Sequence, residues 1–367
     1  MKVVFVTQVL DPSHGSLAQT LDLVTALAAE TDELVVLCRE DRWGAAPDGV
    51  TVRTYDAGSK LGRALAYQRQ LARSLDDADA LLAHMVPTFL VLAAPLARTR
   101  RVPLLLWYTH WHAGRMLRAA TALCTVALSV DKASYPIASP KVRGIGHAID
   151  VDVFAGEPAE PHGGPLRLLA VGRTARWKGL ATLLQAVAVA TDRGLDATLE
   201  IRGPSLTSDE EAHRAELIAT IDRDDRLRGR ASVTPPVARA EVPGLIRSAD
   251  VVVNPVEPSS GAALDKVVYE AGACARPVVT TNAALAPFLR DLPVPLLAPP
   301  SDPAALADVL VAVGAAGPEV RGATGTELRR RVVADHSLDH WAKAVIQVVR
   351  EVRSGRVSVR SGRRPTA

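Results

Sequence analysis

Three positively charged residues, Arg173, Arg176 and Lys178, lie on one loop near the middle of the chain. The loop reads Val171-Gly-Arg-Thr-Ala-Arg-Trp-Lys-Gly179 and follows an apolar run, Leu166–Val171, that is typical of a buried strand. Arg173 offers a planar fork of N–H donors and Lys178 a compact ammonium group, and both groups bind phosphate oxygens well. Gly172 allows the backbone to approach a ligand closely. The loop could therefore hold a diphosphate, although a solvated basic loop would have the same composition.

A second segment joins another apolar run, Val251–Asn254, to a predicted helix. The intervening loop of small residues, Ser259–Ala263, can direct backbone N–H groups at an anion, next to the positive end of a helix that begins near Leu264. Glu270 lies on that helix and is followed by the small residues Ala271 and Gly272, which leave room for a ligand. The alternative is an exposed i, i+4 ion pair between Glu270 and Lys266, which is common on any helix.

The first half of the chain has polar loops at corresponding places. Gly15 lies between a predicted strand and a helix, where the spacing alone favours a tight turn with Ser16 as the helix cap. The segment Trp107-Tyr-Thr-His-Trp-His112 ends an apolar strand, and its two histidines make a weak metal site because no third ligand is near them in sequence. His84 ends another apolar run and could line a ligand site or be structural.

Short β-branched runs alternate with segments of helical period almost throughout the chain, and the runs lack the strict alternation of half-exposed strands. This pattern predicts an α/β protein with parallel sheets covered by helices on both faces. Ligands of such sheets bind beyond the carboxyl ends of the strands, where the loops described above lie. The runs are Val3–Thr7, Glu33–Cys38, Ala80–His84, Val102–Tyr108, Thr125–Ser129, Val142–Gly146, Leu166–Val171, Thr198–Arg202, Val251–Asn254 and Val278–Thr280.

A loop-like segment rich in proline, glycine and glutamate interrupts the alternation over residues 157–165, and the pattern then restarts. We therefore predict two doubly wound, Rossmann-like domains, residues 1–154 and 155–337, that face each other across a cleft. A helix over residues 338–352 carries an apolar stripe with Trp341 and is expected to pack back on the first domain. The remaining residues, 353–367, are predicted to form a disordered basic tail.

Charge and cysteine content argue against several other classes of protein. The formal net charge is +3, but the last fifteen residues hold five arginines and no acid, and without those arginines the charge is −2. The basic balance therefore does not indicate a nucleic-acid partner. The three cysteines have no metal-ligand or redox spacing, which predicts free thiols in a reducing compartment. Because no signal-peptide pattern and no apolar run of about 20 residues is present, we expect a cytoplasmic enzyme.

The chain resembles the GT-B glycosyltransferases of family 4 (group 1 type), which are typically retaining enzymes. The resemblance extends over most of the chain and is strongest from about residue 145 to residue 281. Any one of the shared motifs alone would be weak, but together they are fairly specific. The matched motifs are Gly172-Arg173 with Lys178-Gly179, Glu270-Ala271 with Pro277–Val279, and His147-Ala148-Ile149-Asp150, which stands where the family commonly has asparagine-glycine-hydrophobic-aspartate.

The resemblance implies a role for each matched residue in binding a nucleotide-diphosphate sugar. Arg173 and Lys178 would bind the diphosphate and stabilise the departing nucleotide, and His110 would lie close to the donor sugar. Glu270 would accept hydrogen bonds from the ribose hydroxyls. The remaining donor contacts would come mainly from backbone groups, at Gly15, Gly172, Gly203, Val237, Gly261, Ala262, Ala263 and Leu264.

One position departs from the family pattern. The family usually places another glutamate eight residues before the ribose glutamate, where it orients the donor sugar, and that position is Ala262 here. Asp265 could replace the missing carboxylate, or it could cap the helix that follows. The identity of the donor sugar is the property that this departure affects most.

The implied reaction is transfer of a glycosyl group from the donor to an acceptor by a retaining, hexosyltransferase-type enzyme that needs neither a metal nor another cofactor. The acceptor could be a small molecule, a saccharide or a lipid-linked compound. The alternatives are a non-catalytic nucleotide-sugar-binding protein, suggested by Ala262, and a nucleotide-sugar epimerase. The basic amphipathic segment Ser59–Arg73 could rest on an anionic membrane, although a solvated helix face is the commoner explanation for such a segment.

Overall fold

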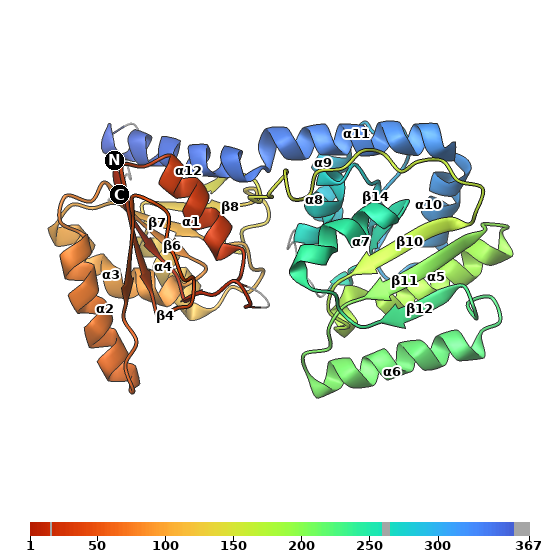
Figure 1. Cartoon of the computed structure of the whole chain (residues 1–367), viewed down its shortest axis with the longest axis horizontal. Helices are drawn as coiled ribbons and strands as arrows, with labels where there is room; N and C mark the ends of the chain where they lie inside the picture. Colours follow the sequence, from red (N-terminus) through yellow and green to blue (C-terminus); the bar gives the residue numbers. More distant parts are fainter. Residues whose placement is uncertain (15–16, 259–264, 356–367) are drawn as a thin grey trace, which may run out of the picture. The chain divides into compact units, whose positions relative to one another are not determined.

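The computed structural model describes residues 1–14, 17–258 and 265–355. The chain divides into two compact units, each of which is described by itself (Figure 1). The first unit comprises Met1–Ala148 together with the C-terminal helix, and the second comprises Ile149–Ser337. The boundary between the units thus lies a few residues before the division at residue 154 that the sequence suggested.

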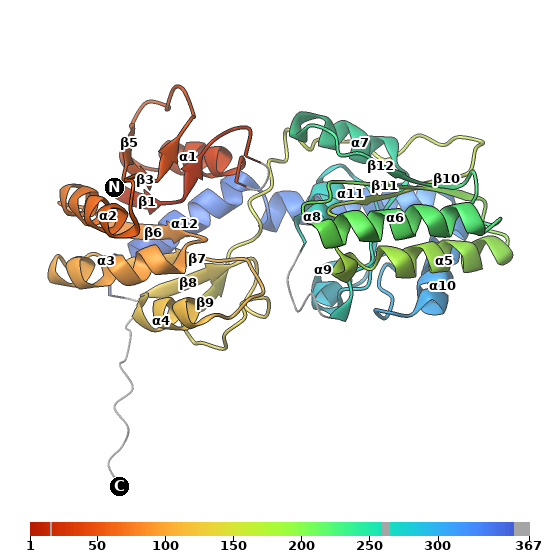
Figure 2. The same ribbon diagram turned by 90° about the horizontal axis from the view of Figure 1, so that it is seen from below.

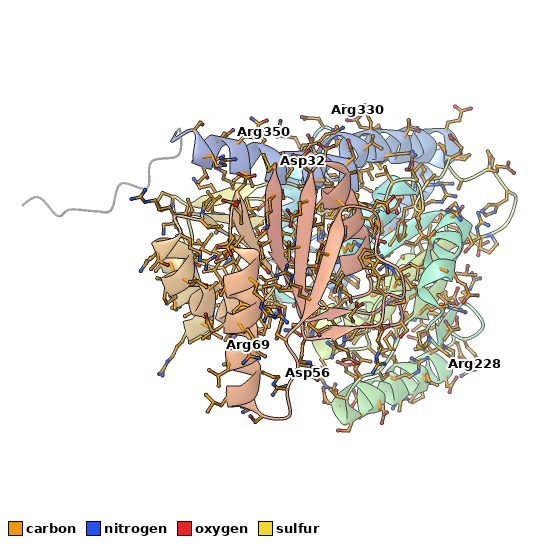
Figure 3. All side chains as sticks on the ribbon, turned by 60° about the vertical axis from the view of Figure 1, so that its left-hand side comes forward. Asp32, Asp56, Arg69, Arg228, Arg330 and Arg350 are labelled. Atoms are coloured by element: carbon orange, nitrogen blue, oxygen red, sulfur yellow. The ribbon has the colours of Figure 1, made fainter. Side chains whose placement is uncertain are left out.

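A seven-stranded sheet with the order β5-β3-β1-β6-β7-β8-β9 forms the centre of the first unit. Every neighbouring pair is parallel, with Val3 of β1 opposite both Leu34 and Ala80. Asp32 and Asp56, labelled in Figure 3, mark the amino edge and the carboxyl edge of this sheet. The strands are β1 (Lys2–Val6), β3 (Glu33–Cys38), β5 (Val50–Thr54), β6 (Ala80–His84), β7 (Leu104–Trp107), β8 (Val126–Ser129) and β9 (Val142–Gly144), and a short separate ribbon pairs β2 (Val9–Leu10) with β4 (Glu40–Asp41).

Helices cover both faces of this sheet because the side chains of each strand alternate between two apolar cores. Val3 and Phe5 belong to one core, with α1 (Thr20–Ala29) and α12 (Leu338–Arg353). Val4 and Val6 belong to the other core. The helices over that second core lie side by side (Figure 2): α2 (Lys60–Ser74), α3 (Pro87–Thr99) and α4 (Arg115–Leu123).

The C-terminal helix α12 is an integral part of the first unit. Its Trp341 is fully buried and packs edge-on against Trp107, with 5.7 Å between the ring centroids. Val345 and Val349, one and two helical turns further on, are also fully buried. Burying each of these side chains stabilises the unit by about 1.5–3 kcal/mol. Helix α12 lies beside α1, the helix that follows the first strand (Figure 1).

The second unit is built on a five-stranded parallel sheet with the order β12-β11-β10-β13-β14. Helices α5, α6 and α10 pack together on one face, and α7, α8 and α11 lie on the other (Figure 2). The strands are β10 (Leu166–Val171), β11 (Ala197–Arg202), β12 (Ala231–Thr234), β13 (Val251–Asn254) and β14 (Val278–Thr280). The helices are α5 (Leu180–Asp192), α6 (Ser208–Arg223), α7 (Val242–Ser248), α8 (Lys266–Ala273), α9 (Ala286–Leu289), α10 (Pro303–Ala315) and α11 (Gly317–Asp335). The predicted doubly wound α/β architecture is confirmed.

The irregular segment that opens the second unit is fixed by a buried arginine. Arg276 is 5% exposed, and its guanidinium donates hydrogen bonds to the carbonyl oxygens of Ala249 (2.7 Å), Arg247 (2.6 Å) and Glu157. Burial lowers the pKa of Arg276 from its ordinary value. The carbonyl groups satisfy the buried donors, so the segment around Glu157 is anchored to the unit rather than loose.

Two further expectations from the sequence concern cysteines and membrane spans. Cys38, Cys124 and Cys274 are free and buried, and burial raises the pKa of the Cys38 thiol to about 12 and of the other two to about 11. No single helix among the described residues has both the length and the apolar character to cross a membrane. Helices α10 and α11 meet both criteria only as a pair, and the chain bends by 107° between them.

Candidate functional site

The loops after β10 and β11 touch backbone to backbone at the carboxyl edge of the second sheet. Gly172 follows β10 with φ at +148°, and its N–H donates to the carbonyl oxygen of Arg202 at 3.0 Å. A Cβ atom added to Gly203 would lie 1.8 Å from the carbonyl oxygen of Gly172. No side chain fits between the loops, so glycine at position 203 is required for this contact.

A third loop, which follows β13, joins the same site at Gly179. This glycine has φ at +64° and directly precedes α5, and a Cβ atom there would lie 1.5 Å from the carbonyl oxygen of Pro255. The N–H of Glu257 donates to the carbonyl oxygen of Trp177 at 2.9 Å. The fold brings the loop after β10 and the loop after β13 together, although these loops lie about 80 residues apart along the chain.

Lys178 connects the two motifs through a direct ion pair. Its Nζ lies 2.8 Å from Oδ2 of Asp265, and the two side chains are only 13% and 18% exposed. The ammonium group also lies 4.5 Å from the ring centroid of Trp177, in cation–π geometry. Asp265 immediately precedes α8, but its side chain makes no capping hydrogen bond. Of the two roles weighed from the sequence, capping is therefore not the one that Asp265 performs here.

Arg173 is held by Glu210, a residue that the sequence did not single out. Glu210 lies on α6 and is 4% exposed, whereas the Arg173 side chain is 42% exposed. Nε and Nη2 of Arg173 both donate to this carboxylate, which also accepts the N–H of Leu206 at 2.7 Å. The buried carboxylate of Glu210 thus orients Arg173 and leaves part of the guanidinium accessible to solvent. One sequence signal was available, because Glu210 follows Thr207 at the spacing of a helix cap.

Glu210 stays ionised in this environment. Burial raises its pKa, but the hydrogen bonds from Leu206 and Arg173 and the charge of Arg173 outweigh that effect, and the net pKa lies below the ordinary value. The pair is therefore a carboxylate with a guanidinium at neutral pH. Arg173 is already ordered by this contact, which reduces the conformational entropy that the side chain would lose on binding an anion.

Glu270 lies on α8, one turn after its start. Nζ of Lys266 is 3.6 Å from Oε1 of Glu270, at the i, i+4 spacing considered from the sequence. The two side chains are 20% and 13% exposed, so the pair is largely buried and not an ordinary exposed surface pair. Val237 lies in the loop after β12, at the carboxyl edge of the same sheet. The other expected donor contacts, at Gly15, Gly261, Ala262, Ala263 and Leu264, lie outside the described residues.

The histidines of the first unit differ in character. His84 is buried, its Nδ1 lies 3.1 Å from Oγ1 of Thr7, and burial lowers its pKa to about 4, which fits a neutral structural residue. His110 is exposed, stacks on Trp111 and accepts the N–H of His112 on Nδ1 at 3.1 Å. Partial burial and the neighbouring His112 lower the pKa of His110, which keeps it neutral at physiological pH. His110 therefore remains the candidate of the two for contact with a ligand.

The motif His147–Asp150 lies at the boundary between the units, and it has alanine at position 148, where the family commonly has glycine. Ala148 has φ at +56°, a left-handed conformation that costs a residue with a Cβ atom roughly 1–2 kcal/mol. The family commonly has glycine there, and glycine adopts this conformation without that cost. Position 148 thus keeps the backbone conformation that favours glycine, although its residue is alanine.

Two other features of the described residues bear on the site: the grouping of metal-ligating side chains, and a cavity at the other edge of the second sheet. Among residues 1–14, 17–258 and 265–355, no group of three or more His, Cys, Asp or Glu side chains could hold a metal ion. A cavity of about 480 Å³ lies at the opposite, amino edge of the second sheet, beside Asp196 and Asp250. Asp250 already accepts hydrogen bonds from Arg167 and His162, so this cavity offers less chemistry than the glycine-rich loops.

Comparison with solved structures identifies the class of fold. The chain is similar to HepE of Anabaena, solved in complex with UDP, with a TM-score of 0.75 and 17% identity over 96% of this chain and all of that one. It is also similar to sucrose-phosphate synthase of Thermosynechococcus elongatus, with a TM-score of 0.73 and 17% identity over 96% and 99% of the two chains. The chain has the GT-B fold.

Comparison of sequences gives a narrower match within that fold. Residues 165–316 match the family "Glycosyl transferases group 1", and this segment contains Arg173, Lys178 and Glu270. D-inositol 3-phosphate glycosyltransferase of Pseudarthrobacter chlorophenolicus is 33% identical over 144 residues, which are 38% of this chain and 32% of that protein. The matched region thus spans about a third of the length of this relative.

Proposed function

We propose that this protein transfers a glycosyl group from a nucleotide-diphosphate sugar to an acceptor. The observation that carries the proposal is the contact of 2.8 Å between Lys178 and Asp265, because it joins the cationic loop to the start of the helix that bears Glu270. Both motifs lie within the segment that matches the group 1 glycosyltransferases. Their place at the carboxyl edge of a doubly wound sheet is where such folds bind ligands.

The proposed chemistry assigns one task to each part of the site. As the bond between sugar and phosphate breaks, negative charge grows on the leaving diphosphate, and the positive charges of Arg173 and Lys178 stabilise it. Asp265 holds the Lys178 ammonium group in place, as Glu210 holds the Arg173 guanidinium. Glu270 accepts hydrogen bonds from the ribose hydroxyls. These fixed charges require no reorganisation during the reaction, which is the advantage of a preorganised site.

Three finer properties belong to the same proposal. Arg173 and Lys178 can both direct charged N–H donors at a diphosphate, so we propose that the reaction needs no metal. We propose retention of configuration through attack on the front face of the sugar, assisted by the donor phosphate. UDP is the first nucleotide to test because HepE was solved with UDP and with UDP-glucose. The acceptor panel should contain saccharides, lipid-linked compounds and inositol phosphates, the last because of the name of the matched relative.

The experiment that tests this function incubates the purified chain with a panel of UDP-, GDP- and ADP-sugars, alone and with the acceptor panel. We expect a glycosylated product only when donor and acceptor are both present, and the same initial rate after dialysis against EDTA. A sugar converted with donor alone would indicate an epimerase instead. Nucleotide binding without turnover across the panel would indicate a non-catalytic binding protein. A rate lost in EDTA and restored by magnesium or manganese would contradict the metal-independent mechanism.

Replacing Glu270 by alanine tests the proposed ribose contact. We expect the affinity for free UDP and for the full donor to fall together, by roughly ten- to a hundredfold, because a hydrogen bond to a charged group is worth about 1.5–3 kcal/mol. Calorimetric titration measures both affinities. Lys266→Ala is the matched control, since it removes the same ion pair from the other side. Equal losses in the two variants would show that the pair acts only by supporting α8.

A further inference from the structure

Helix α2 of the first unit presents an unusual stripe to the outside. Leu61, Leu65, Arg69 and Arg73 follow one another at i, i+4 spacing, and all four are exposed. Leu61 is 72% exposed and Leu65 is 63% exposed, so two large apolar side chains lie next to each other on the surface. Arg69, labelled in Figure 3, lies one turn further along the stripe. The helix is held on its opposite side by the buried Tyr67 and Leu71.

Helices α2, α3 and α4 themselves carry no acid. Asp56 precedes α2, and Asp76, Asp77 and Asp79 follow it, with Asp76 paired to Arg100. Residues 57–75 and 80–130, which include all of α2, α3 and α4, hold nine lysines and arginines and neither aspartate nor glutamate. The helices on the other face of the same sheet are mixed in charge, with Asp22 on α1 and Asp339 on α12. The helices of one face of the unit therefore carry an excess of positive charge, which general solubility would not require.

More exposed apolar side chains belong to the same face. Trp111 is 44% exposed and Met116 is 48% exposed, and Arg115 and Arg118 lie beside Met116 at the start of α4. Helices α2 and α4 both follow the carboxyl ends of strands, so their first turns lie at the same edge of the sheet. Apolar side chains at the helix starts, with arginines around them, form the amphipathic pattern of an interfacial surface.

We propose that this face, formed by α2 and by residues 111–118, docks the protein on an anionic lipid bilayer. Leu61 and Leu65 enter the boundary between headgroups and acyl chains, and the arginines pair with anionic headgroups. A nucleic acid would match the positive charge but not the exposed leucines. A second copy of this chain would match the leucines but not the arginines, since two faces with an excess of positive charge repel each other. The proposal does not depend on glycosyl transfer, and its test uses no donor sugar.

The test measures cosedimentation of the full chain with vesicles of phosphatidylcholine alone and of phosphatidylcholine mixed with phosphatidylglycerol. We expect binding to the mixed vesicles, little binding to the neutral ones, and a marked loss of binding in about 0.5 M salt because the charges are then screened. Leu61→Ser with Leu65→Ser, and separately Arg69→Glu with Arg73→Glu, should each lower the partition coefficient at least about tenfold. Thermal melting should show that both double variants remain folded, because the replaced side chains are exposed.

The matched control is Ile218→Ser with Val333→Ser, which replaces two exposed apolar side chains on α6 and α11 of the second unit. This variant should bind the mixed vesicles as the wild type does. Equal binding to neutral and anionic vesicles would overturn the proposal, as would unchanged binding of the leucine variant. Light scattering that shows self-association of the wild type, lost in the leucine variant, would assign the face to a second copy and would also overturn it.

Discussion

Arg173→Ala should bind nucleotide-diphosphate sugars roughly ten- to a hundredfold more weakly than the wild type, because it removes charge-assisted hydrogen bonds worth about 1.5–3 kcal/mol. The same variant should also be less stable, by about 1–3 kcal/mol, because the buried carboxylate of Glu210 loses its cationic partner. The estimate is at the lower end of the range for buried pairs since the guanidinium is 42% exposed. Calorimetry measures the affinity, and urea denaturation measures the free energy of unfolding.

A second substitution separates the two effects of this variant. Glu210→Gln keeps the shape of the side chain and can still accept the N–H of Leu206, so Arg173→Ala with Glu210→Gln should recover most of the lost stability. It should not recover donor affinity if Arg173 binds the diphosphate. Recovery of both would mean that Arg173 acts only as a structural partner of Glu210. The donor affinity of Lys178→Ala is measured in the same way. Unchanged donor affinity in both Arg173→Ala and Lys178→Ala would eliminate the proposed phosphate site.

Gly179→Ala should destabilise the second unit by about 3 kcal/mol or more. Two causes combine: φ of +64° is strained for alanine, and the new Cβ would lie 1.5 Å from the carbonyl oxygen of Pro255. Because this oxygen belongs to backbone, the loop after β13 must move away from the loop after β10. Donor affinity should then fall as well, since that movement separates Lys178 from Asp265. Hydrogen exchange resolved by peptide measures the stability of each unit separately.

The control for this variant is Gly194→Ala in the same unit. Gly194 also has a positive φ, +88°, but a Cβ atom there would have no neighbour within 4 Å. We expect that variant to lose only about 1 kcal/mol, the cost of the backbone strain alone. Equal losses at positions 179 and 194 would show that the close approach to Pro255 relaxes without cost, and that the two loops need not be in contact.

The fold was predictable where strands are buried on both faces. The runs Glu33–Cys38, Ala80–His84, Leu166–Val171 and Val251–Asn254 are largely apolar, and the structure gives these strands the same bounds. The strands β5 and β12 were not predicted, and each is at the edge of its sheet. An edge strand needs less apolar surface, and Val50–Thr54 alternates with polar residues that reach solvent. Helix α11 was also missed, because its many arginines and glycines leave only a weak apolar period.

The candidate site was predictable as a set of loops but not as a set of partners. The type and spacing of Arg173 and Lys178 indicated anion binding, the family resemblance implied the ribose role of Glu270, and the doubly wound fold indicated the edge at which their loops meet. The spacing of Thr207 and Glu210 marks the start of a helix but does not identify the partner of Arg173, because Glu210 lies 37 residues away on a helix with three acids in its first turn. Only the packing of α6 determines which of those acids becomes buried. The roles of Gly15 and of residues 261–264 stay predictions, since the structure does not describe them.

The membership of α12 in the first unit has a consequence for synthesis of the chain. The second unit ends at Ser337, so every residue that it needs has been made before α12 begins. The first unit lacks Trp341, Val345 and Val349 until the second unit has been made, and the part of its core beside Trp107 stays uncovered until then. Domains usually complete their folding in the order of synthesis. Here the unit that is begun first is the one that is completed last, and a nascent chain must carry an exposed apolar sheet face while the second unit is being made.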